Sequence, residues 1–161
     1  MTNYIPTIGI EVHVELKTNT KIFSNSLNGY GQMANSLTNV VDLGYPGTLP
    51  TVNKEVINLA IKAACVLNCK IRKEMHFDRK NYFYPDNPKN FQITQGRTPI
   101  GYDGYVEIEV DGTKKKIEIE EMHIEEDTCK STHRGDKTLL DFNRAGVPLI
   151  EIVTKPCISS S

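Results

Sequence analysis

The stretch Ile8-Gly9-Ile10-Glu11-Val12-His13-Val14-Glu15-Leu16 alternates apolar and polar residues and therefore predicts a β-strand. Successive side chains of a strand point to opposite faces, so the aliphatic residues form one face and Glu11, His13 and Glu15 stand on the other. Two carboxylates flanking an imidazole on a rigid element can form a metal or proton-transfer site. The same pattern also fits a half-buried strand whose polar face meets water. The strand by itself leaves both interpretations open.

A second acidic stretch resembles the first. In residues 120–127, Glu121, His123 and Glu125 share one face for as long as strand geometry lasts. Acid runs are usually solvated, but crowded carboxylates repel one another and a bound cation relieves the repulsion. Glu151 is the only polar residue of the run 149–153, so it either faces water or is held by a cation or by strong hydrogen bonds.

The segment 77–88 combines two adjacent cations, Arg79 and Lys80, with four aromatic residues. Such a combination can bind phosphate and stack a base. It also fits a core strand whose cations are solvated, and composition alone does not separate the two interpretations.

The overall composition is that of a soluble globular protein. The 161 residues are 39% hydrophobic and 24% charged, enough for one domain with a core. The net charge of −1 excludes an overall basic field, so nucleic acid would have to meet a local patch. No run is long enough to span a membrane and no signal peptide is evident, so we expect a cytoplasmic protein. The four cysteines lack paired zinc spacing and predict no disulfides.

Local signals predict one helix and one tight hairpin. Asn53 is a plausible N-cap with Glu55 in the first turn, and apolar residues at helical spacing follow, which predicts a helix over 54–67 packed on a sheet. Asp111-Gly112 between two alternating runs predicts a two-residue type I′ turn. That turn places Glu109 opposite Lys114, along with two further pairs, Glu107 with Lys116 and Val106 with Ile117.

The remaining segments are less regular. Residues 70–78 and 91–95 are expected to be extended, and residues 128–138 to form a polar loop. Residues 139–143 and 149–153 are expected to be strands.

Five stretches of the chain together resemble the B subunit of the aspartyl/glutamyl-tRNA(Asn/Gln) amidotransferases. They are residues 8–24, 45–69, 77–95, 123–133 and 139–156. They occur in the order typical of that family and cover nearly the whole chain. Five long motifs in order are much more specific than any one of them.

The resemblance implies a ligase activity. A protein of this family uses ATP to phosphorylate the side-chain carboxylate of Glu-tRNA(Gln) or Asp-tRNA(Asn), and ammonia released from glutamine then displaces the phosphate. The implied cofactors are ATP and Mg²⁺ or Mn²⁺. The implied partners are the amidase (A) and small (C) subunits of a heterotrimer and the tRNA, with no membrane.

The resemblance also implies an α+β fold of the glutamine synthetase type, a mostly antiparallel sheet flanked by helix. Residues 1–161 would be the N-terminal portion of the catalytic domain, without the helical and tail domains that follow in the family. We therefore expect the chain alone not to complete the amidation.

Carried over motif by motif, the resemblance assigns candidate site residues. The metal and catalytic candidates are Glu11, His13, Glu125 and Glu126, with Glu151 as a further metal ligand and Glu15 as a weaker one. The candidates for contacts with ATP phosphate or the substrate carboxylate are Arg79, Lys80, Asn81, Tyr82 and Arg144. Arg144 would either stabilise developing charge or hold its own loop.

The sequence departs from the family in one local feature. Many members carry paired cysteines that bind zinc between the first strand and the helix. The corresponding positions here are Ser24, Ser26, Asn39 and Asp42, so no zinc is expected.

Two other functional classes compete with the ligase. The chain could be a non-catalytic module that binds tRNA or a partner protein, in which case the acidic rows are solvated faces. A metal-dependent hydrolase has only the carboxylates in its favour, because no Ser/His/Asp or Cys/His nucleophile arrangement stands out.

Overall fold

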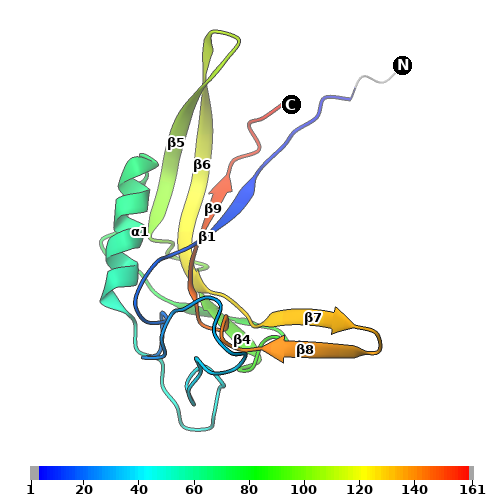
Figure 1. Ribbon diagram of the computed structural model, residues 1–161. Helices are drawn as coiled ribbons and strands as arrows, with labels where there is room; N and C mark the ends of the chain where they lie inside the picture. Colours follow the sequence, from blue (N-terminus) through cyan, green and yellow to red (C-terminus); the bar gives the residue numbers. More distant parts are fainter. Residues whose placement is uncertain (1–3, 160–161) are drawn as a thin grey trace.

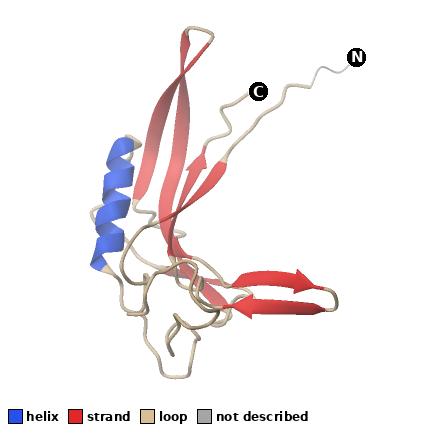
Figure 2. Ribbon diagram, viewed as in Figure 1, coloured by secondary structure: helices blue, strands red, loops and turns tan. Residues whose placement is uncertain are grey.

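We describe the chain from a computed structural model, which places residues 4–159. The described residues form one helix and nine strands (Figures 1 and 2). In chain order these are β1 (Glu11–Glu15), α1 (Lys54–Val66), β2 (Lys70–Ile71), β3 (Asp78–Asn81), β4 (Phe91–Thr94), β5 (Gly101–Val110), β6 (Thr113–Glu126), β7 (Lys130–Arg134), β8 (Lys137–Asp141) and β9 (Pro148–Thr154). The predicted α+β class, with a mostly antiparallel sheet and one flanking helix, is confirmed.

Five strands form an antiparallel sheet in the order β1-β9-β6-β5-β2. The first and last strands of the described chain are therefore neighbours, and the chain enters β1 and leaves β9 at the same end of the sheet (Figure 1). The β3–β4 and β7–β8 hairpins are separate two-stranded sheets, and β7–β8 projects away from the main sheet (Figure 1).

The β5–β6 hairpin has the predicted register. Val110 pairs with Thr113 and Glu109 with Lys114, and the other predicted pairs follow. Asp111 and Gly112 both have positive φ, 52° and 73°, as a type I′ turn requires.

Helix α1 begins where its cap predicts. The Asn53 side-chain oxygen accepts a hydrogen bond from the Glu55 amide at 2.9 Å. The helix buries Val56, Ala60 and Ala64 in the core. It lies on the side of the sheet formed by β5 and β2, so it does not cover β1 (Figure 1).

One predicted loop is wrong. Residues 128–138 contain β7 and the beginning of β8, which pair from Lys130–Asp141 to Arg134–Lys137. Gly135, at φ 60°, allows the chain to reverse within two residues. The polar composition concealed the hairpin because neither of its faces joins the core, so it shows no apolar alternation.

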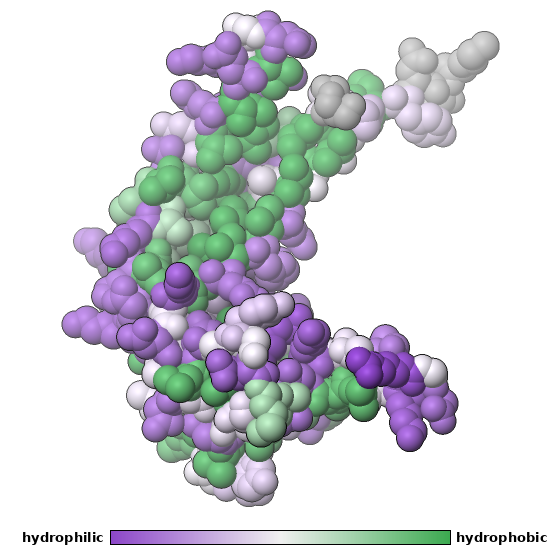
Figure 3. Space-filling view, viewed as in Figure 1, coloured by the Kyte–Doolittle hydropathy of each residue, from purple (hydrophilic) through white to green (hydrophobic). Residues whose placement is uncertain are grey.

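The aliphatic face of β1 is more exposed to solvent than its alternating pattern suggests. Val12 and Val14, on the aliphatic face, are 44% and 38% exposed, and a band of apolar surface follows this part of the molecule (Figure 3). The opposite, polar face of the neighbouring strands contains buried charged groups instead. No helix among the described residues has the length and apolar character needed to cross a bilayer.

Candidate metal and phosphate site

The sheet register joins the two polar rows predicted from the sequence. Glu151 of β9 lies directly opposite His13 of β1 on one side and His123 of β6 on the other. Directly paired residues of antiparallel strands share a face, so these three side chains form one row across the sheet. Glu125, two residues beyond His123, stands on the same face.

The side chains of this row are in contact. His13 Nε2 lies 3.1 Å from Glu125 Oε1 and 3.6 Å from Glu151 Oε2. His123 Nε2 lies 2.9 Å from Glu151 Oε2. His123 Nε2 also lies 3.8 Å from Glu125 Oε2, so each of the two carboxylates lies between two imidazoles.

The cluster is asymmetric in burial. Glu125 and His123 are buried, whereas the side chain of His13 is half exposed. Burial opposes protonation of His123, but the carboxylates of Glu125, Glu151 and Glu121 outweigh it and raise the His123 pKa.

This donor set fits a divalent cation. One ligand atom each from His13, Glu125 and Glu151 lies within 4.8 Å of the other two. Two carboxylates and an imidazole suit Mg²⁺ or Mn²⁺. His123 Nδ1 lies 3.4 Å from Glu121 Oε1 without forming a hydrogen bond, whereas Nε2 lies closer to Glu151, so the contact with Glu151 is the stronger of the two that orient the ring.

An open pocket of about 470 Å³ gives access to the cluster. Its wall includes Glu11 and Glu15 of β1, together with Lys80 and Gln92, which are directly paired in the β3–β4 hairpin. Lys80 is the one lysine of this wall, which also contains several carboxylates. An ammonium placed here can bind the oxygens of a phosphate or carboxylate ligand.

The structure does not bring Glu126 to this cluster. Adjacent residues of a strand face opposite ways, so Glu126 points into the core side of the sheet. Its carboxylate pairs with Lys89 and accepts a hydrogen bond from the Ile93 amide at 3.0 Å. Burial raises the Glu126 pKa, and the charge of Lys89 opposes this shift.

Of the four candidates at residues 79–82 for contacts with phosphate or carboxylate, Lys80 alone lines the pocket. Arg79 and Asn81 lie on the hairpin face opposite Lys80, and the Arg79 guanidinium stacks 4.4 Å from the Phe91 ring centroid. Tyr82 is partly buried, and burial together with the charge of Asp86 and other carboxylates raises its pKa to about 12.

Arg144 holds its own loop. Its guanidinium donates to the carbonyl oxygens of Thr128 at 3.0 Å and Cys129 at 2.9 Å, and lies 3.3 Å from Asp127. Of the two roles expected for Arg144, these contacts favour holding its own loop over stabilising developing charge.

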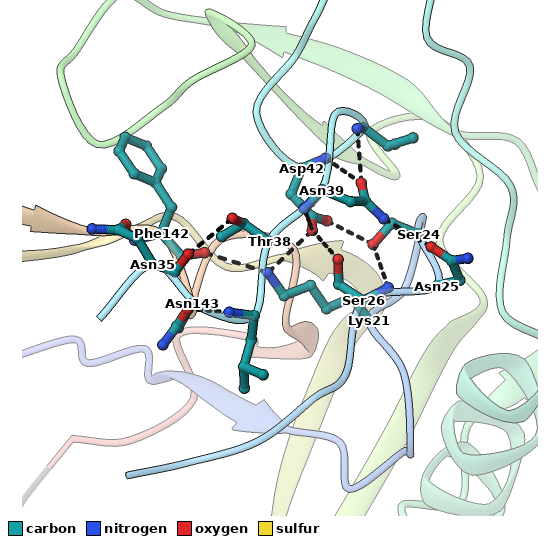
Figure 4. Close-up of polar contacts among 12 residues, drawn as sticks. Lys21, Ser24, Asn25, Ser26, Asn35, Thr38, Asn39, Asp42, Phe142 and Asn143 are labelled. Atoms are coloured by element: carbon teal, nitrogen blue, oxygen red, sulfur yellow. Dashed lines mark hydrogen bonds and ion pairs between the residues drawn. The ribbon is translucent and has the colours of Figure 1, made fainter. Parts of the chain in front are cut away.

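Ser24, Ser26 and Asn39, three of the four positions at which no zinc is expected, converge on the carboxylate of the fourth, Asp42 (Figure 4). Asp42 accepts hydrogen bonds from the hydroxyls of Ser24 at 2.7 Å and Ser26 at 2.5 Å, and from the Asn39 amide at 3.0 Å. Lys21, fully buried, completes the group 3.4 Å from Asp42. Burial lowers the Lys21 pKa against the attraction of Asp42. These side chains form a hydrogen-bonded ionic cluster.

Sequence reasoning placed His123 on one face with Glu125 but did not assign it to the site, and it missed Lys21 and Lys89. Lys21 and Lys89 give no local signal, because their carboxylate partners are distant in sequence.

Comparison with known proteins agrees with this architecture. Residues 6–161 match the family model described as the GatB/GatE catalytic domain. The chain is 62% identical to the aspartyl/glutamyl-tRNA(Asn/Gln) amidotransferase B subunits of Limosilactobacillus fermentum and Lactiplantibacillus plantarum, over 98% of its own length and 33% of theirs. Against that of Bacillus thuringiensis it is 62% identical over 92% of the chain and 31% of the relative. It thus spans about a third of the length of these relatives. The match across nearly all of its length shows that the chain belongs to the GatB/GatE catalytic domain family of amidotransferase subunits.

Proposed function

We propose that this chain forms part of the carboxylate-activating site of a tRNA-dependent amidotransferase. The γ-phosphoryl group of ATP passes to a side-chain carboxylate oxygen of Glu-tRNA(Gln) or Asp-tRNA(Asn), giving ADP and an acyl phosphate. Ammonia from glutamine then attacks the acyl carbon and phosphate leaves. The partners are the amidase (A) and small (C) subunits of the heterotrimer.

The convergence of His13, Glu125 and Glu151 from three adjacent strands carries this proposal. Phosphoryl transfer is mainly positioning and charge neutralisation. A divalent ion bound by these side chains supplies positive charge for phosphate oxygens.

The chain's own residues have distinct tasks in this proposal. His13, Glu125 and Glu151 hold the ion, and His123 orients the Glu151 carboxylate through its 2.9 Å contact. Lys80, across the pocket, binds phosphate or the substrate carboxylate. Because Glu125 and Leu149 are buried at the back of the pocket, one side of the site is shielded from water.

Mn²⁺ binding provides the first test. Isothermal titration of the wild-type chain should show one Mn²⁺ site, and His13→Ala and Glu151→Gln should each weaken binding at least tenfold. His76→Ala is the matched control, because His76 is exposed and lies outside the pocket.

Activity provides the second test. This chain would replace the matching segment of the Limosilactobacillus fermentum relative, assembled with the other subunits of that enzyme. ATP, glutamine and Glu-tRNA(Gln) should then yield ADP, phosphate, glutamate and Gln-tRNA(Gln), and His13→Ala should abolish the formation of ADP and of Gln-tRNA(Gln) while tRNA still binds. Unchanged turnover in His13→Ala and Glu151→Gln would reject the catalytic role and favour a module that only binds tRNA or a partner.

A further inference from the structure

The strand β6 has only one neighbouring strand where it carries His123 and Glu125. On its other side, β5 pairs with β6 only as far as Gly101, which lies opposite Met122. From His123 onward, β6 pairs with β9 alone among the described strands. The edge of β6 that faces away from β9 therefore has no strand ladder beside the metal cluster, and its buried peptide groups need other partners.

Side chains of β4 and of the residue after it bond this open edge. Gln95 Oε1 accepts a hydrogen bond from the Ile124 amide at 3.0 Å and another from the Ile100 amide at 3.2 Å. Gln92 Nε2 donates to the Glu126 carbonyl oxygen at 2.6 Å. Ile124 and Glu126 are two residues apart in one strand, so their peptide groups point to the same edge. Two glutamine side chains thus take the place of the missing strand.

The contacts of Gln95 are the closest to the metal ligands. Gln95 is 1% exposed, so water does not replace its oxygen as an acceptor. Ile100 immediately precedes β5, so this one oxygen joins the start of β5 to the end of β6. Ile124 lies between His123 and Glu125 in sequence. A fixed Ile124 amide therefore fixes the backbone from which both side chains project into the cluster.

Gln95 acts through the oxygen of its amide group. Its Nε2 is buried and has no hydrogen-bond partner within residues 4–159. A buried N–H group without a partner is unfavourable for stability. An apolar residue of the same length would remove that unfavourable group, but it would leave the two peptide amides unpaired. The contribution of this side chain is therefore its acceptor.

We propose that Gln95 is a positioning residue of the carboxylate-activating site, and that its hydrogen bond to the Ile124 amide holds Glu125 where it can bind the ion together with His13. The inference rests on the proposed function for the identity of the ion site. Glu125 Oε1 lies 3.1 Å from His13 Nε2, so a shift of the β6 backbone directly changes the separation of two ligands. Ligands need to be held within about 0.5 Å of their productive geometry.

Mn²⁺ titration of Gln95→Met tests the consequence for the ion site. Methionine is unbranched like glutamine but lacks a strong acceptor, so the two buried amides lose their partner. We expect Mn²⁺ binding to weaken about tenfold. Gln95→Glu keeps an oxygen that can accept both hydrogen bonds, and its added negative charge favours a cation. This variant should bind Mn²⁺ at least as tightly as wild type.

Ile93→Ala is the matched control for a general loss of stability. Ile93 lies in β4 and belongs to the hydrophobic core, so its truncation leaves a cavity. Its only bond to β6 among those described comes from the main chain, which alanine keeps. Affinities are compared well below the lowest Tm of the set. Ile93→Ala should retain the wild-type affinity for Mn²⁺, whereas a purely structural role of Gln95 predicts equal losses in the two variants.

Amide hydrogen exchange of the metal-free chain tests the placement of β6 itself. In Gln95→Met, the Ile124 amide should exchange at least about tenfold faster than in wild type. The amide of Ile150, which is directly paired with Ile124, is the internal reference, because a global loss of stability speeds the exchange of both. Gln95→Asn is one methylene shorter and cannot reach both amides, so it should show the same change and serves if Gln95→Met does not fold.

Three results would overturn the inference. The first is equal Mn²⁺ affinity in Gln95→Met and wild type, or equal losses in Gln95→Met and Ile93→Ala. The second is a Gln95→Glu chain that binds Mn²⁺ as weakly as Gln95→Met, because the acceptor would then not matter. The third is an unchanged exchange rate at Ile124.

Failure of the proposed function gives a different result. A wild-type chain that shows no Mn²⁺ site would reject the proposed function, and the exchange rate of the Ile124 amide would then decide alone whether Gln95 holds this strand. A wild-type chain that binds Mn²⁺ while Gln95→Met binds it equally well would reject only the present inference.

Discussion

Glu125 and Glu126 are neighbours in sequence but have opposite surroundings. Glu125 faces His13 at 3.1 Å, and Glu126 faces Lys89 and the Ile93 amide on the other side of the sheet. Strand alternation alone forbids both side chains from joining one site unless a bulge intervenes. The irregularity in β6 falls earlier, between Ile119 and Glu121, so the alternation holds through both glutamates.

The Glu126–Lys89 pair should stabilise the fold without contributing to metal binding. Glu126→Gln leaves the ammonium of Lys89, mostly buried, without its counter-charge, so we expect a loss of about 2–4 kcal/mol in the free energy of unfolding. Urea denaturation measures the loss. The double change with Lys89→Met should cost less than the sum of the single changes. This role would be contradicted if the losses in the free energy of unfolding of the two single variants added up in the double variant. It would also be contradicted if Glu126→Gln bound Mn²⁺ as weakly as Glu125→Gln.

Asp78 should make stability depend on acid pH. Its carboxylate accepts hydrogen bonds from the amides of Gly96 at 2.9 Å and Arg97 at 3.2 Å, and these lower its pKa from 3.8. A lowered folded-state pKa gives stability that is present above pH 3.8 and lost as the pH falls through the folded value.

Urea midpoints measured across pH check this linkage. The difference between wild type and Asp78→Asn should be largest near neutral pH and shrink below about pH 4. Asp136→Asn, in the exposed turn between β7 and β8, serves as the control. The difference in urea midpoint between this variant and wild type should not change with pH. A flat difference for Asp78→Asn would refute the assignment.

At the scale of elements, the approach of α1 to β5 depends on Gly104. A Cβ at this position would lie 2.3 Å from Cys69 Sγ and 2.7 Å from the Leu67 carbonyl oxygen. Because Leu67 is the C-cap of α1, the helix end would have to move away from the sheet. We expect Gly104→Ala to cost about 1–3 kcal/mol in thermal or urea unfolding.

The control for this change is Gly9→Ala. The nearest atom to a Cβ at Gly9 is the Thr154 carbonyl oxygen at 3.6 Å, an ordinary contact, so its effect should stay within about 0.5 kcal/mol. Similar losses for both variants would show that helix α1 has room to shift.

At the scale of the whole molecule, metal binding should stabilise the sheet. The three ligands come from β1, β6 and β9, strands that lie far apart in the chain, so an ion bound only by the folded state holds them together. Mn²⁺ at about 100 times its Kd should add about 2.7 kcal/mol and raise the Tm by roughly 5–10 °C.

Differential scanning fluorimetry with and without Mn²⁺ measures this shift. Glu151→Gln should abolish the shift, whereas Glu126→Gln should retain it on a lower starting Tm. An equal shift in wild type and Glu151→Gln would place the ion elsewhere.

Local interactions were enough to predict part of the fold from the sequence. The Asn53 cap and the Asp111-Gly112 turn are decided within a few residues, so α1 and the register of β5–β6 could be predicted. The alternation around His13 likewise identified one polar face, because the period of a strand is a local property.

Only the tertiary structure decided how those faces combine. The pairing of β9 between β1 and β6 places Glu151 between His13 and His123, and no local pattern encodes which strands become neighbours. Strand alternation sets Glu126 on the face opposite Glu125 and Arg79 on the hairpin face opposite Lys80, but only the tertiary packing brought Lys89 to Glu126 and Lys80 to the pocket. The sequence by itself determined which residues share a face, since that depends on backbone geometry. The packing of distant strands determined which faces meet, because it depends on burying surface across the whole chain.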